Sequence, residues 1–92
     1  MQQRTLTIQN KLGIHMKPAS LFVREAGKYK SKIFVYKNNL ENRKISAKSL
    51  IGVLTLAAGM GTTITILADG EDAEQALDGL EDLVIRRKFD EE

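Results

Sequence analysis

The residue best suited to chemistry in this chain is its single histidine, His15, which Lys17 and Pro18 closely follow. Proline favours the first turn of a helix because it has no N–H to lose and its φ is already suitable. Pro18 therefore predicts a helix that starts just after His15. The backbone N–H groups of Met16 and Lys17 would then point out of the helix start, where the helix dipole is positive. An anion carried on His15 would meet these donors and the Lys17 ammonium.

A neutral imidazole is a nucleophile near neutral pH, because its unprotonated form is well populated there. The sequence has no second histidine, no cysteine, and no acidic residue close to His15 along the chain. A hydrolytic triad is therefore poorly supported, and we expect neither a metal nor a cofactor. The remaining reaction is attack of the imidazole on an electrophile that gives an anionic covalent product. A phosphoryl group fits this description best. The alternative is a structural or merely exposed histidine, which is the usual role of a lone histidine in a small domain.

The composition predicts one small cytoplasmic domain that spans residues 1–92. The absence of cysteine excludes disulfides and is consistent with a reducing compartment. Residues 1–10 lack the apolar core of a secretion signal, and no run approaches the ~18 to 20 apolar residues of a membrane span. The net charge of +2 is too small to argue for nucleic acid, although basic residues crowd the middle of the chain and acidic residues gather at 69–82. Residues 89–92 have no predicted role and are expected to fray.

Four segments have the pattern of strands. Residues 4–9 alternate between apolar and polar, as a half-buried strand does, and residues 32–37 form a second candidate. A turn-rich stretch separates the second candidate from a short third strand at 43–46, and residues 62–68 form the fourth.

Apolar residues at helical spacing predict three helices. The first follows the histidine and ends at Gly27, which can take the left-handed conformation of a C-cap. The second covers residues 48–58, with Ser46 or Ser49 as its N-cap. The third, at 71–87, is acidic at its start and basic at its end, as the helix dipole favours. The order βαββαβα predicts an α+β domain: a four-stranded, mainly antiparallel sheet with three helices on one face, and Thr and Lys on the other.

The second predicted helix has more apolar residues than one buried face can take. Some of them should be exposed near His15 if the first two helices are neighbours. Such a patch, ringed by cations, would suit partners with an apolar, acid-rimmed surface. For any single apolar residue here, burial in the core is the alternative. The candidate docking residues are Ser20, Arg24, Lys48, Leu50, Ile51 and Leu54.

Two motifs carry a family resemblance. Residues 13–20 read GIHMKPAS, residues 48–56 read KSLIGVLTL, and an Asp69–Gly70 turn then leads into an acidic helix. Over residues 3 to 86 or so, the chain resembles the HPr phosphocarrier family of the bacterial phosphoenolpyruvate-dependent sugar phosphotransferase system. The resemblance implies an open-faced β-sandwich and a phosphoryl-group carrier rather than a turnover catalyst.

The resemblance also assigns roles to residues. It implies that His15 accepts a phosphoryl group on Nδ1 from enzyme I and passes it to IIA proteins, with Met16 and Lys17 beside the phosphate. It implies that Ser49 matches a regulatory serine that a dedicated kinase modifies in some bacteria, so a serine kinase or phosphorylase is a further candidate partner. The alternative for Ser49 is a helix N-cap with no regulatory role. We expect a monomer.

The chain departs from the family motif, which usually reads Gly-x-His-Ala-Arg-Pro-Ala. Lys17 keeps the charge of arginine but lacks the guanidinium fork that can hold phosphate through two hydrogen bonds, and Met16 is bulkier than alanine. These departures leave open a second function, an HPr-like regulatory paralogue that acts by binding proteins without sugar phosphotransfer. A nucleic-acid-binding domain ranks last, because strand aromatics suited to base stacking are limited to Phe34 and Tyr36.

Overall fold

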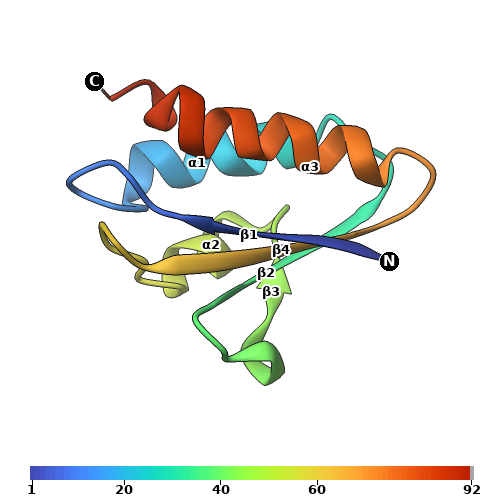
Figure 1. Ribbon diagram of the computed structural model, residues 1–92, viewed down its shortest axis with the longest axis horizontal. Coiled ribbons are helices and arrows are strands. Elements are labelled where there is room, and N and C mark those ends of the chain that lie inside the picture. The colour runs from blue at the N-terminus through green and yellow to red at the C-terminus, as the bar shows by residue number, and fades with distance from the viewer. Residues whose placement is uncertain (92) are drawn as a thin grey trace.

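The structure is a computed structural model that describes residues 1–91, and it confirms the predicted α+β architecture (Figure 1). Its four strands form one sheet in the order β1-β4-β2-β3, and every neighbouring pair is antiparallel. The strands are β1 (Gln2–Thr7), β2 (Lys32–Lys37), β3 (Ile45–Ser46) and β4 (Thr63–Asp69).

Two of the three α-helices, α1 (Met16–Ala26) and α3 (Ala73–Glu81), lie side by side over one face of the sheet (Figure 1). The short helix α2 (Leu50–Thr55) packs against α1 and β3. A π-helical turn, Asp82–Arg86, continues α3. The loop before α1 meets the loop after α2, because Ile14 donates its N–H to the Ala58 carbonyl, and Lys48, just before α2, bonds the Tyr29 carbonyl beyond the end of α1.

The core lies between the sheet and the helices. Successive strand residues point to opposite faces, and the β4 residues Ile64 and Ile66 pack toward the helices with no exposed surface. Phe22 from α1 and Leu77 from α3 cover them and are also fully buried. This alternation is the pattern that the sequence predicts for a sheet covered on one side.

The other face of the sheet is more apolar than predicted. Thr5 and Thr65 share a hydrogen bond of 2.9 Å there, as expected for a polar face. However, Phe34 and Tyr36 alternate with the core residues of β2, so they belong to this open face, and Tyr36 is buried. Thr and Lys do lie on this face, as predicted, but the two aromatic residues, which the prediction did not include, lie there as well.

Three predicted boundaries need correction. Gly27 does follow α1, but its φ of −66° is right-handed, so the predicted left-handed cap is wrong. Helix α2 ends at Thr55, before the left-handed Ala57 (φ 49°), rather than reaching Ala58. The third strand is also shorter than predicted, because residues Glu41–Arg43 form a 3₁₀ turn.

The C-terminal segment is ordered as far as it is described, which contradicts the expected fraying. Lys88, Phe89 and Asp90 all have positive φ, so a left-handed turn follows the helical segment. Phe89 has no exposed surface, and Arg87 forms an ion pair with Asp90. Burial of an aromatic ring anchors the segment to the core. The last residue of the predicted frayed stretch, 92, lies outside the described residues.

Within residues 1–91, no helix is long and apolar enough to cross a membrane.

Candidate functional site

His15 immediately precedes α1, in the N-cap position, as the position of Pro18 predicts. Its backbone is extended (φ −100°, ψ −161°), and its carbonyl accepts the N–H of Ala19 at 2.9 Å. The imidazole does not cap the helix, and its side chain is 40% exposed. Met16 and Lys17 follow in the first turn and are both exposed. Their N–H groups belong to the set that has no intrahelical acceptor. The ring is therefore accessible beside a positive helix end.

A tight turn holds the histidine loop against the loop that follows α2. Gly13 adopts a left-handed φ of 67°, and its N–H donates to the Asn10 carbonyl at 3.1 Å. Ile14, which is buried, donates its N–H to the Ala58 carbonyl at 2.8 Å. A Cβ atom on Gly13 would lie 2.3 Å from the same carbonyl oxygen. Glycine is required here both by the backbone angle and by the close approach of the two loops.

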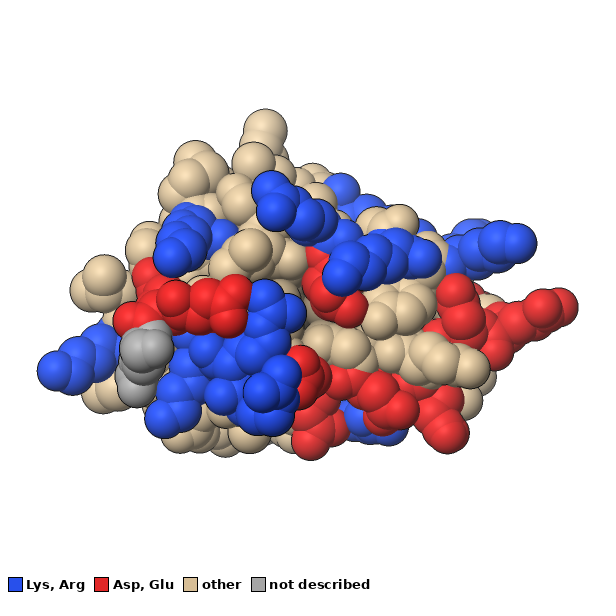
Figure 2. All heavy atoms as spheres, turned by 90° about the horizontal axis from the view of Figure 1, so that it is seen from above, with Lys and Arg blue, Asp and Glu red and all other residues tan. Residues whose placement is uncertain are grey.

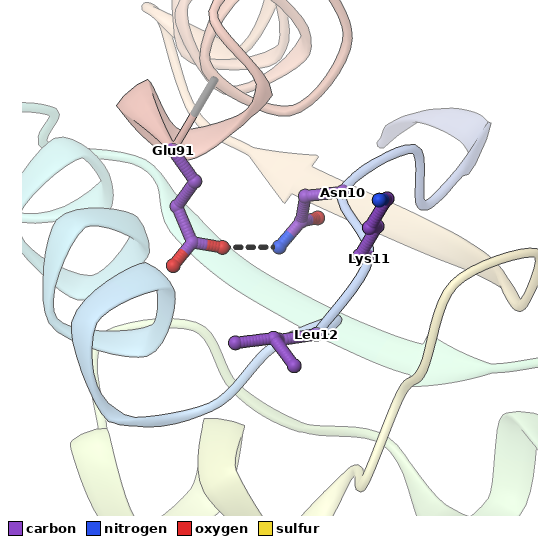
Figure 3. Close-up of a pocket in the computed structure, with 4 residues that line it drawn as sticks. All are labelled: Asn10, Lys11, Leu12 and Glu91. Carbon is purple, nitrogen blue, oxygen red and sulfur yellow. Dashed lines mark hydrogen bonds between the residues drawn. The ribbon is translucent and has the colours of Figure 1, made fainter.

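Glu91 contacts the histidine ring from the far end of the sequence. Its Oε2 lies 2.8 Å from His15 Nε2, and its Oε1 accepts a hydrogen bond of 2.7 Å from Asn10 Nδ2 (Figure 3). The Asn10 amide also donates to the Gly13 carbonyl at 2.7 Å. No acidic residue lies near His15 in the sequence, but the fold brings Glu91 into contact with it. The prediction that His15 has no acidic neighbour is therefore wrong.

The electrostatics at Glu91 favour its ionised form. Burial raises the pKa of this carboxyl group, but hydrogen bonds from Asn10 and His15 outweigh burial and hold the pKa below its ordinary value. The nearby Lys17 charge acts in the same direction. At neutral pH, Glu91 therefore presents a carboxylate to the ring.

An open pocket of about 470 Å³ lies beside this contact and is lined by Asn10, Lys11, Leu12 and Glu91 (Figure 3). Leu12 is 73% exposed and forms an apolar wall that sequence reasoning missed. Among residues 1–91, no cluster of three or more His, Asp or Glu side chains could hold a metal ion.

Ser49, rather than Ser46, is the N-cap of α2. Its Oγ accepts the N–H of Gly52 at 3.1 Å, whereas the Ser46 hydroxyl accepts the N–H of Lys48. The Ser49 residue is nevertheless exposed. The Ser49 side chain therefore caps α2 and is also exposed enough for a partner protein to reach it.

The predicted docking residues divide by exposure. Ile51 is 77% exposed and Leu50 is also exposed, whereas Leu54 is half-buried against the core. Arg24 is exposed and Ser20 is half-buried. Lys48 is exposed, and its ammonium group donates a hydrogen bond of 2.7 Å to the Tyr29 carbonyl.

Met60, which is 60% exposed, is an apolar surface residue that was not predicted from the sequence.

Charge is unevenly distributed over the face that carries α1 and α3. Figure 2 shows a dense group of Lys and Arg side chains toward the end where the C-terminus lies. Most Asp and Glu side chains lie toward the opposite end, and a smaller acidic group lies among the cations near the C-terminus. Figure 1 places the start of α1 at the C-terminal end, so His15 lies at the more basic end of this face.

The order βαββαβα and the four-stranded antiparallel sheet show that the chain has the open-faced β-sandwich fold. Residues 2–86 match the family described as PTS HPr component, phosphorylation site. A solved structure titled HPr-C-His, from Thermoanaerobacter tengcongensis, superposes with a TM-score of 0.90 at 41% identity, covering 100% of this chain and 99% of that one. The chain therefore belongs to the HPr phosphocarrier family of the phosphotransferase system.

The relatives include two kinds of protein. The phosphocarrier protein HPr of Cupriavidus necator is 40% identical over 87 residues, covering 95% of this chain and 94% of that protein. The HPr-like protein Crh of Halalkalibacterium halodurans is 38% identical over 80 residues, covering 87% of this chain and 92% of that protein. The family is thus established, and the particular role within it is a separate question.

Proposed function

We propose that this chain carries a phosphoryl group on His15, which it takes from enzyme I and passes to IIA proteins. The observation that carries the proposal is the accessible imidazole at the start of α1, followed by the exposed Lys17. No cysteine competes as a nucleophile. An imidazole in this setting can accept a phosphoryl group and release it again.

The interactions available to a phosphoryl group on His15 are of modest strength, which suits a protein that must bind the group and then release it. Met16 and Lys17 offer backbone donors at a helix start, and such an interaction with an anion contributes roughly 0.3 to 1 kcal/mol. This stabilises bound phosphate without trapping it. The open position of the ring, which is 40% exposed, also allows partners to approach the phosphate.

A relay experiment tests the proposal. The chain is incubated with phosphoenolpyruvate and enzyme I, and a IIA protein is then added. We expect an acid-labile phosphate on the chain that moves to the IIA protein. A chain that takes up no phosphate would contradict the proposal. A chain that takes up phosphate but never gives it away would also contradict it.

A second candidate function is regulation by protein binding without sugar phosphotransfer. It is supported by the similarity to an HPr-like protein Crh and by the exposed Ser49 beside the exposed Ile51. In the relay experiment, this role would give stable complexes and no transfer.

Phosphorylation of Ser49 is proposed as the control of partner binding. A Ser49→Asp variant is expected to bind enzyme I about tenfold more weakly, because it places a negative charge beside the apolar docking residues. Aspartate is also a good N-cap, so the fold should be retained. Ser49→Ala is the control: it should lower the free energy of unfolding by about 1 kcal/mol and leave affinity unchanged. Equal affinity of Ser49→Asp and the wild type, measured by calorimetry, would leave Ser49 with its capping role alone.

Ile51 is the sharpest test of the docking patch, because Leu54 is half-buried and a charge there would disturb packing. Ile51→Glu is expected to weaken enzyme I binding about tenfold or more, since an exposed apolar contact is replaced by a charge. Its free energy of unfolding should change by less than about 0.5 kcal/mol, as is usual for an exposed position. Ile51→Leu should bind like the wild type. If Ile51→Glu binds equally well, the patch lies elsewhere.

A further inference from the structure

We infer that Glu91 is a positioning residue for His15: it holds the imidazole with its proton on Nε2 and leaves the lone pair of Nδ1 free for the phosphoryl group. The inference rests on the proposed function of His15. It concerns the residue at the end of the described chain, five positions beyond the segment that matches the family at residues 2–86.

The contact fixes where the proton lies. An ionised carboxylate can only accept hydrogen bonds, and Glu91 Oε2 lies 2.8 Å from His15 Nε2. Nε2 must therefore carry a hydrogen. A neutral imidazole has one N–H and one lone pair, so Nδ1 then has the lone pair. Within residues 1–91, the structure gives Nδ1 no hydrogen-bond partner, and the ring does not cap α1.

The carboxylate is held in place by more than the ring. Its second oxygen accepts from Asn10 Nδ2 at 2.7 Å, and the same amide donates to the Gly13 carbonyl at 2.7 Å. Asn10 is only 1% exposed, so this link is a buried connection between the tail and the histidine loop. The Glu91 side chain is itself only 17% exposed, so most of it is packed against its neighbours. A carboxylate that is fixed in this way can select one tautomer of a histidine.

The turn before Glu91 explains how a C-terminal residue reaches the start of α1. Lys88, Phe89 and Asp90 form a left-handed turn after the helical segment, and the buried Phe89 ring anchors this turn to the core. The ion pair between Arg87 and Asp90 closes the turn. Glu91 is thus delivered by a packed segment rather than by a loose end.

The positioned ring is ready for phosphoryl transfer. The Nδ1 lone pair forms the new N–P bond as the bond between phosphorus and the donor's leaving atom breaks, and the leaving atom keeps that electron pair. The Nε2 proton stays between His15 and Glu91. The positive charge that the ring acquires is paired with the carboxylate, and it disappears when the phosphoryl group moves on and neutral imidazole is released.

Nitrogen-15 NMR of the unphosphorylated chain tests the inference, because ring-nitrogen shifts report which nitrogen carries the proton. Glu91→Ala is expected to raise the ratio of the Nδ1–H to the Nε2–H tautomer about three- to tenfold, and Glu91→Gln should give a smaller rise since its amide oxygen is a weaker acceptor. Glu74→Gln is the matched control: it removes an exposed carboxylate from the first turn of α3, which takes no part in holding Glu91 or His15. An unchanged tautomer ratio in Glu91→Ala would overturn the inference.

A second readout separates this inference from the proposed function. Phosphoramidate is used as the donor, so that no partner protein is needed, and ammonia is the leaving group. Uptake by Glu91→Ala should be about three- to tenfold slower than by the wild type, while Glu74→Gln should match the wild type. Equal rates in all three proteins would contradict the inference even if carriage is real. If the tautomer responds but the wild type accepts no phosphate from enzyme I, the ring is positioned as inferred and the proposed function fails.

Discussion

His15→Ala is expected to take up no acid-labile phosphate from phosphoenolpyruvate and enzyme I. Alanine has no nucleophilic atom, and the chain has neither a second histidine nor a cysteine to replace the lost imidazole. Serine and threonine hydroxyls would form phosphate esters, which are stable in acid. The assay therefore separates phosphate on a ring nitrogen from phosphate on any hydroxyl.

The variant should keep its fold, which makes the loss interpretable. The His15 side chain is 40% exposed and makes no capping hydrogen bond, so alanine removes only the contact with Glu91. The free energy of unfolding in urea should fall by about 1 kcal/mol or less, the scale of a partly exposed charged contact. Acid-labile phosphate that persists in folded His15→Ala would show that another residue carries it.

Gly13→Ala is expected to lower the free energy of unfolding by about 2 to 5 kcal/mol. Two costs combine at this position. A left-handed backbone costs a residue with a Cβ about 1 to 2 kcal/mol, and Gly13 has a φ of 67°. The new methyl group would also lie 2.3 Å from the Ala58 carbonyl oxygen and 2.6 Å from the Gly59 Cα, which forces the two loops apart. Overpacking of this kind typically costs about 1 to 3 kcal/mol.

Gly61→Ala is the matched control for Gly13→Ala. Gly61 is also left-handed, with a φ of 86°, but no atom of its surroundings lies within 4 Å of an added Cβ. It should therefore show the backbone cost of about 1 to 2 kcal/mol alone. Equal losses for the two variants in urea unfolding would mean that the histidine loop is not packed against Ala58 as described.

The parts of the molecule that have strong local signals could be predicted from the sequence. Pro18 placed the start of α1 correctly at Met16, with His15 as its cap. The strand predicted at residues 32–37, a short apolar run between two lysines, has the bounds of β2. Both features depend on the chemistry of a few adjacent residues, and tertiary contacts do not overrule them.

Features that depend on distant contacts could not be predicted. Glu91 lies 76 positions from His15, and the packing of the C-terminal segment, anchored by Phe89, brings them together. The one available signal was an aromatic residue in a polar tail, which is unusual for a segment that frays. The end of α2 was similarly hidden, because a left-handed alanine such as Ala57 has no local signature. The roles of Ser49 and the docking residues stay predictions.

Phosphorus–nitrogen coupling in the phosphorylated chain shows which atom carries the phosphoryl group. The protein is labelled with nitrogen-15 in its single histidine and phosphorylated with phosphoenolpyruvate and enzyme I. We expect one phosphorus signal coupled to Nδ1 of His15, with the proton retained on Nε2. Phosphate found on Nε2, or on an oxygen atom elsewhere in the chain, would contradict this expectation.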